Sequence, residues 1–168
     1  MSTFLRILKA IFGELFKPKS FVKGEAFEDY LRRNVFPDEG YETLHRTHNI
    51  NIIDDDFNEE NKLPDFKFRS LSKKWEFWVE AKYRSKPGKN KIEWCKEYQL
   101  RRYRRYDKDL ALFVALGVGG SPEKPSVLYV FPLRKLPYTT AFLSALRPYR
   151  VSLHDLPIRV DVLRNQLK

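Results

Sequence analysis

Two segments near the middle of the chain, 65–70 and 75–82, alternate apolar and polar residues with the two-residue period of a β-strand. In each segment the apolar side chains would lie on one face of the strand and the polar side chains on the other. Only residues 71–74 separate the two segments, which predicts an antiparallel hairpin. A shift of one residue in its pairing would turn every apolar side chain from the core to solvent, so the register is strongly specified.

The register that buries the apolar side chains also brings two acidic residues together. It pairs Phe66 with Val79 and therefore places Asp65 directly opposite Glu80. Side chains opposite each other on neighbouring strands have Cβ atoms about 5 Å apart. Two carboxylates at that separation repel each other unless a cation lies between them. The hairpin thus predicts a site for a divalent cation.

Residues around this acidic pair supply the remaining groups for phosphodiester chemistry. Mg²⁺ or Mn²⁺ takes carboxylate, carbonyl and water ligands, so Asp65, Glu80 and the backbone carbonyl of Ala81 are the predicted metal ligands. Lys82 lies on the same strand face as Glu80, where its ammonium can stabilise an attacking hydroxide and the charge on the phosphate. The alternative is an exposed strand face with alternating charge. The preceding apolar strand and Pro64-Asp65 favour the metal site.

The motifs resemble the signature of the PD-(D/E)XK nuclease superfamily, which has the restriction-endonuclease-like fold. The signature corresponds here to Pro64-Asp65 followed by Glu80-Ala81-Lys82. The segment 23–31 is similar to the first helix of that family, and 99–103 is similar to the Gln-hydrophobic-x-x-Tyr motif of its RecB-like branch. The resemblance spans residues 23 to about 131.

The resemblance implies a metal-dependent nuclease that acts on DNA rather than RNA. It implies that Glu28 assists the metal and that Gln99 contacts the phosphate or the waters of the metal. The implied catalytic residues are Asp65, Glu80, Lys82, Glu28 and Gln99, and the implied metal ligands are Asp65, Glu80, Ala81 and Glu28.

Helical spacing bears on both assisting residues. A predicted helix over 21–35 has an apolar stripe with Glu28 at its edge, so this carboxylate could reach a buried site. The alternative is an exposed helix glutamate. A second predicted helix, over 92–106, places Cys95, Gln99, Tyr103 and Tyr106 on one face. Gln99 and Tyr103 would then either contact the site or simply pack the helix on the sheet.

Charge indicates a polyanionic partner. The chain has 32 Lys and Arg residues against 22 Asp and Glu residues, a net charge of +10 and a pI near 9.7. The densest basic cluster, 101–106, follows Gln99 directly and predicts phosphate contacts, with tyrosines available to stack on bases. The predicted nucleic-acid-binding residues are Lys67, Arg101, Arg102, Tyr103, Arg104 and Arg105. Charge alone also fits a catalytically silent nucleic-acid-binding module of the same fold within a larger complex.

Length and composition predict one catalytic domain, 20–168, preceded by an amphipathic helix and connector, 1–19. The helix is too short and too charged to cross a bilayer and lacks a secretion signal's cleavage site. Packing on the domain or forming a homodimer is favoured over membrane-surface contact, because the connector is short. The single Cys95 excludes an internal disulfide, and the scattered histidines form no zinc motif. We expect a cytoplasmic protein.

The remaining elements complete the predicted α/β fold. The continuous apolar run 110–118 is typical of a central strand buried on both faces, and it ends at glycines read as a turn, 117–120. Further strands are predicted over 41–53 and 126–132, a short helix over 139–146 and an edge strand over 158–163. This order predicts a mixed central sheet flanked by helices, with a restriction-endonuclease-like topology implied by the resemblance.

Overall fold

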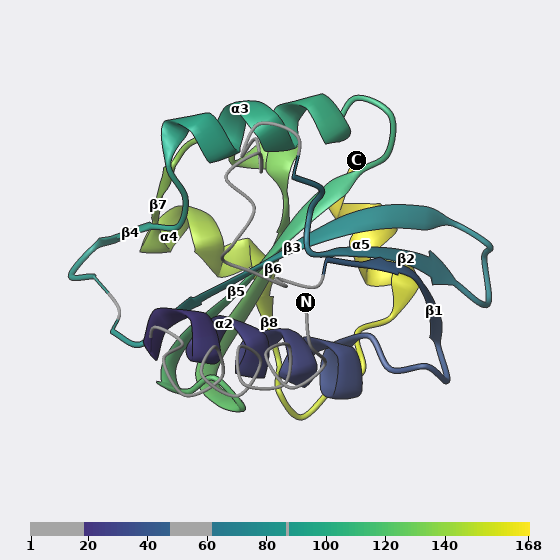
Figure 1. Ribbon diagram of the computed structural model, residues 1–168, viewed down its shortest axis with the longest axis horizontal. Helices are drawn as coiled ribbons and strands as arrows, with labels where there is room; N and C mark the ends of the chain where they lie inside the picture. The colour runs from purple at the N-terminus through teal and green to yellow at the C-terminus, as the bar shows by residue number, and fades with distance from the viewer. Residues whose placement is uncertain (1–18, 48–61, 87) are drawn as a thin grey trace, which may run out of the picture.

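The computed structural model describes residues 19–47, 62–86 and 88–168, so the predicted N-terminal amphipathic helix lies outside the described residues. A mixed six-stranded sheet forms the centre of the molecule (Figure 1). Its strands, in spatial order, are β1 (Tyr41–Arg46), β2 (Phe66–Ser70), β3 (Glu76–Arg84), β5 (Leu112–Ser121), β6 (Lys124–Pro132) and β8 (Arg150–Val151). Strands β3 and β5 run parallel, and all other neighbours in this sheet are antiparallel.

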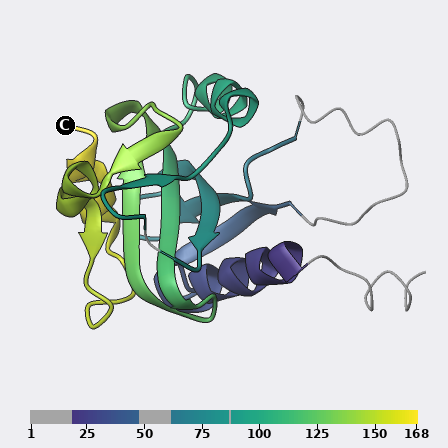
Figure 2. The same ribbon diagram turned by 90° about the vertical axis from the view of Figure 1, so that its left-hand side faces the viewer.

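Helices cover both faces of the sheet. They are α2 (Lys19–Tyr30), its π-helical continuation η1 (Leu31–Val35), α3 (Glu97–Tyr106), α4 (Leu143–Leu146) and α5 (Val160–Gln166). A small two-stranded sheet of β4 (Lys91–Glu93) and β7 (Thr140–Phe142) lies beside α3 and α4. Figure 2 shows the same arrangement from the side, with α2 and α3 well separated. The coarse prediction of an α/β fold with a mixed, helix-flanked sheet is confirmed.

The sheet separates two hydrophobic cores. Helices α2 and α5 pack on one face through residues such as Phe27 and Leu163, and α3 and α4 pack on the other through residues such as Leu100 and Leu146. Strand β5 serves both cores, because Phe113 and Ala115 point to the first while their neighbours along the strand point to the second. The predicted central strand is therefore buried on both faces.

The hairpin of β2 and β3 has the predicted register. Phe66 pairs with Val79, Phe68 pairs with Phe77, and residues 71–74 form the turn. Pairing between β2 and β3 ends at Phe66, whereas β3 pairs with β5 as far as Arg84. Beyond Val79, β3 therefore still pairs with β5 on one side, but β2 no longer pairs with it on the other. This leaves a gap beside β3.

Helix α3 begins five residues later than predicted. Residues 92 and 93 belong to β4, Lys96 is extended with φ −97° and ψ 160°, and the helix starts at Glu97. Ile92 and Trp94 are both buried, two residues apart, as in a strand that presents one face to the core. Cys95 is buried ahead of the helix, so it does not share a helical face with Gln99.

Of two predictions near the C-terminus, one is wrong and the other is right only in part. The segment 158–163 is not an edge strand but leads into α5, because Val160 and Leu163 are buried in the same core at helical spacing. The predicted helix over 139–146 is helical only from Leu143, since 140–142 pair with β4 as strand β7. The edge strand on this side of the central sheet is β8 instead.

The predicted glycine turn is also displaced. Strand β5 continues through Gly117 to Ser121, and the turn to β6 lies at 122–123. Gly119 and Gly120 have φ of 68° and 64°, which glycine adopts without strain. The predicted helix over 21–35 matches α2 with η1. Of the predicted strand over 41–53, residues 41–46 form β1, and 48–53 lie outside the described residues. Within the described chain, no helix combines the length and apolarity needed to cross a membrane.

Candidate active site

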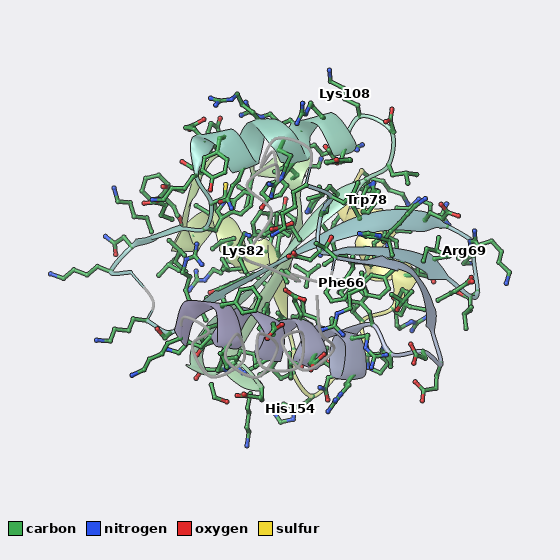
Figure 3. The ribbon with its side chains drawn as sticks, viewed as in Figure 1. Phe66, Arg69, Trp78, Lys82, Lys108 and His154 are labelled. Carbon is green, nitrogen blue, oxygen red and sulfur yellow. The ribbon has the colours of Figure 1, made fainter. Side chains whose placement is uncertain are left out.

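A cavity of about 520 Å³ opens beside β3, where β2 no longer pairs with it. Residues of α2 line one side of the cavity, and residues of α3 line another. Figure 3 shows Lys82 on β3 in the space between these two helices. All predicted catalytic residues line this one cavity, namely Glu28, Asp65, Glu80, Lys82 and Gln99.

Where β2 stops pairing with β3, the side chain of Asp65 accepts a hydrogen bond from β3 in place of the β2 backbone. Its Oδ2 accepts a hydrogen bond of 2.8 Å from the backbone N–H of Ala81. Within a strand, the N–H and C=O of one residue point to the same side. The carbonyl of Ala81 therefore faces the gap next to the Asp65 carboxylate, as a metal ligand would need to.

Glu80 is almost fully buried, with 2% of its surface exposed, and its two carboxylate oxygens have different surroundings. Oε1 accepts hydrogen bonds from Lys82 Nζ and from Tyr103 Oη, each at 2.5 Å. Oε2 is buried and has no hydrogen-bond partner among the residues that the structure describes. A buried carboxylate oxygen without a donor costs free energy. A cation beside Asp65 would satisfy it.

The third carboxylate comes from the opposite wall. Glu28 lies on α2, has 6% of its surface exposed and is therefore not an exposed helix glutamate. Its Oε2 lies 3.8 Å from Nη2 of Arg46 on β1, but that guanidinium is closer to Asp29, at 2.9 Å. Arg46 therefore neutralises Glu28 only in part.

Burial and mutual repulsion shift the acid constants of the site. Burial, followed by repulsion from Glu80, raises the pKa of Asp65 to about 7. Burial and repulsion from Asp65 raise the pKa of Glu28 to about 8, even though Arg46 opposes the shift. Burial alone would lower the pKa of Lys82, but Glu80, Tyr103 and Asp65 together raise it above its ordinary value. Asp65 and Glu28 therefore resist ionisation in the metal-free protein, whereas Lys82 keeps its positive charge.

The donor set suits a hard cation that keeps several waters. In the part of the chain that is described, three or more His, Cys, Asp or Glu side chains nowhere form a group able to hold a metal by themselves. Asp65, Glu80 and the Ala81 carbonyl supply two carboxylates and one backbone oxygen, with Glu28 on the facing wall. Mg²⁺ is commonly held by one or two carboxylates together with water and substrate phosphates. The unpartnered Glu80 oxygen fits that mode of binding.

The two motif residues of α3 both lie at the site, in different ways. Gln99 lines the cavity, but its Oε1 accepts the backbone N–H of Lys96 at 3.0 Å and so also caps the helix. Tyr103 is fully buried, and its ring stacks on Trp94 with centroids 6.0 Å apart. Because neither ring face is exposed, the prediction that Tyr103 stacks on a base is wrong. Tyr103 instead positions Glu80 through its hydroxyl.

The predicted basic cluster does not form one surface, because successive residues of a helix point in different directions. Arg102 lines the cavity, is buried and lies over the Tyr103 ring. Arg104 donates to the carbonyl of Pro137, and the exposed Arg101 and Arg105 do not line the cavity.

Lys67 is also placed away from the cavity. It forms an ion pair of 2.7 Å with Glu76 and lies over the Trp78 ring. Of the basic residues predicted to bind nucleic acid, Arg102 lines this cavity, and Lys67, Arg101, Arg104 and Arg105 do not. That these residues contact nucleic acid stays a prediction.

Other cavity residues were not predicted. They are Lys19, Phe21, Lys23, Gly24, Lys62, Tyr83, Arg84, Ser85 and Tyr98. Alternation along β3 would have identified Arg84, which follows Glu80 and Lys82 on the same strand face. Its guanidinium donates to the carbonyls of Glu93 and Trp94 and so fastens β4 beside the site. No motif marks the α2 lysines, because only the tertiary fold brings α2 to β3.

Comparison with known proteins gave no match. No family model matches the sequence, and neither a curated protein nor a solved structure is significantly similar to it. The comparisons therefore neither support nor contradict the resemblance to PD-(D/E)XK nucleases.

Proposed function

We propose that the protein is a metal-dependent nuclease with a restriction-endonuclease-like fold, which hydrolyses phosphodiester bonds of DNA. The observation that carries the proposal is the buried Glu80 oxygen without a partner, beside Asp65 and Lys82 in one cavity. Most buried carboxylate oxygens in proteins accept a hydrogen bond. A divalent cation bound beside Asp65 would explain why this Glu80 oxygen has no donor.

The order of elements supports the finer fold assignment. Helix α2 precedes three antiparallel strands, β1 to β3, and helix α3 then leads to β5, which lies parallel to β3. This arrangement is compatible with a restriction-endonuclease-like core. It places the predicted motif residues Glu28, Asp65, Glu80 and Gln99 around one cavity although they are far apart in the sequence.

Each side chain has a role that its surroundings allow. A divalent cation, when bound, would supply Lewis-acid activation of water and neutralise phosphate charge. Asp65, Glu80 and the Ala81 carbonyl would hold it, and Glu28 would assist from α2. The pKa of Lys82 is raised by its carboxylate neighbours, so this ammonium stays protonated. Lys82 therefore acts through its charge on the phosphate rather than as a general base.

A cleavage assay tests the proposal directly. Linear, circular, single-stranded and branched DNA, and RNA, are incubated with the protein in Mg²⁺, Mn²⁺ or a chelator. Cleavage is expected only with metal. Glu80→Ala and Lys82→Ala should each reduce the rate by at least about 10²-fold while largely retaining binding, because each removes stabilisation of the reacting phosphate.

A matched variant controls for contaminating nuclease and for general damage. Glu76 lies on the same face of β3 as Glu80, but its carboxylate pairs with Lys67 and Arg69 outside the cavity. Glu76→Gln should cut as fast as the parent. If Glu80→Ala cuts as fast as Glu76→Gln, the activity does not belong to this site and the proposal fails.

A second candidate is a nucleic-acid-binding module without turnover. In that case the basic residues that line the cavity, Lys19, Lys23 and Arg102, would bind phosphates without a metal. The net charge of +10 serves binding equally well in both cases. Binding to DNA without cleavage under any metal condition would support this module over the nuclease.

A further inference from the structure

Tyr98 is the aromatic residue that the cavity leaves exposed. It lies in the first turn of α3, has 44% of its surface exposed and lines the same cavity as Glu80 and Lys82. An exposed aromatic ring beside buried charged groups has a face available to another planar group.

The other tyrosines near the site have their rings engaged. Tyr103 stacks on Trp94, Tyr106 packs against Trp78 at 5.6 Å, and Tyr83 packs against Phe27 at 5.9 Å. Among the residues that the structure describes, Tyr98 has no comparable ring partner. Tyr98 is therefore the tyrosine of the site whose ring is open to stacking. The rings of Tyr103 and Tyr106, the tyrosines of the basic cluster, are not.

Cationic residues line the same cavity as this ring. Arg102 follows Tyr98 by four residues, so both lie on the same face of α3, and both line the cavity. Exposed Lys19 and Lys23 line it from α2. A ring for the base, with cations for the backbone, is the combination by which proteins hold single-stranded nucleic acids.

The burial of the two carboxylates also favours a single strand over a duplex. Asp65 and Glu80 have 7% and 2% of their surfaces exposed, so a scissile phosphate has to enter the cavity to reach them. The volume of about 520 Å³ suits a ligand of nucleotide size rather than a wide, rigid duplex. A single strand can turn one base out toward a protein ring, whereas a duplex must first unpair it.

We infer that the substrate is a single-stranded nucleic acid or an unpaired end, whose base next to the scissile phosphate stacks on Tyr98. This inference rests on the proposed function, since the phosphate is placed at the proposed metal site. It adds the strand state of the substrate and a residue that recognises it.

Binding without cleavage tests the inference. Fluorescence anisotropy in a chelator gives the Kd of a labelled single-stranded oligonucleotide and of the same sequence as a duplex. Tyr98→Ala should weaken single-strand binding by roughly 5- to 150-fold, the effect of losing one stacked base. Tyr98→Phe should keep most of the affinity, because it keeps the ring. Duplex binding should be weaker than single-strand binding and unchanged by Tyr98→Ala.

Tyr138 provides a matched control. It is a tyrosine with 67% of its surface exposed, and it does not line the cavity. Tyr138→Ala should bind the single strand like the parent. Equal effects of Tyr98→Ala and Tyr138→Ala, or equal affinity for duplex and single strand, would overturn the inference. Tyr98-dependent binding of a strand that no metal causes to be cut would instead overturn the nuclease proposal and leave this mode of binding standing.

Discussion

Asp65 carries an unfavourable charge in the folded protein. Its ordinary pKa is 3.8, and burial with the nearby Glu80 raises the pKa to about 7 in the folded state. The folded state therefore binds the proton more tightly than the unfolded state does. The stability that this group contributes is fully present below about pH 4 and is lost as the pH rises through about 7.

Asp65→Asn should consequently stabilise the metal-free protein at alkaline pH. The amide oxygen can still accept the N–H of Ala81, while the charge is removed. We expect a free energy of unfolding higher by roughly 1–3 kcal/mol near pH 8.5 and a much smaller gain near pH 5. Urea unfolding at the two pH values measures this difference. Glu123→Gln, at an exposed carboxylate in the β5–β6 turn, should change the free energy of unfolding little at either pH value. A gain that is equal at both pH values would contradict the assignment.

Helix α2 and strand β5 meet at a glycine. A Cβ added to Gly117 would lie 2.4 Å from the Phe27 ring, whereas a Cβ on Gly24, in the middle of α2, would meet nothing within 4 Å. Gly117→Ala should therefore destabilise the protein by about 1–3 kcal/mol through overpacking. Gly24→Ala should stabilise it by about 0.5–1 kcal/mol, because alanine favours the helix. Chemical denaturation of both variants checks the pair, and a loss of stability in Gly24→Ala would show that α2 packs differently.

The site and the whole fold are linked through cation binding. A cation requires ionised Asp65, Glu80 and Glu28, so its binding releases protons from groups with raised pKa values, about 7 for Asp65 and about 8 for Glu28. Affinity should rise with pH across this range. Because the unfolded chain lacks the site, bound cation should raise the melting temperature of the entire molecule.

Thermal unfolding with Mn²⁺ and with a chelator measures this linkage independently of catalysis. We expect Mn²⁺ to raise the melting temperature of the parent clearly near pH 8 and little near pH 6. Glu80→Gln should abolish the increase, and Glu76→Gln should retain it. An equal response of the parent and Glu80→Gln would place the cation elsewhere on the protein.

Local patterns predicted the elements that the core enforces directly. The β2–β3 register follows from the alternation of Phe66, Phe68, Phe77 and Val79, because any slip would expose phenylalanines. Short segments escaped prediction, since 91–93 and 140–142 become strands only by pairing with each other. The 158–163 segment has apolar residues that suit a strand or a helix, and packing of Val160 and Leu163 in one core selected the helix.

The sequence by itself determined that the proposed ligands Asp65, Glu80 and Ala81 and the adjacent Lys82 lie together, because they belong to one hairpin whose register is local. Only the tertiary structure decided which other residues surround these groups. It buried Tyr103 against Glu80, brought Glu28 from α2, removed most of the basic cluster from the cavity and left Tyr98 exposed beside it. The orientation of a helix about its axis depends on contacts with distant strands, and no pattern within α2 or α3 alone contains those contacts.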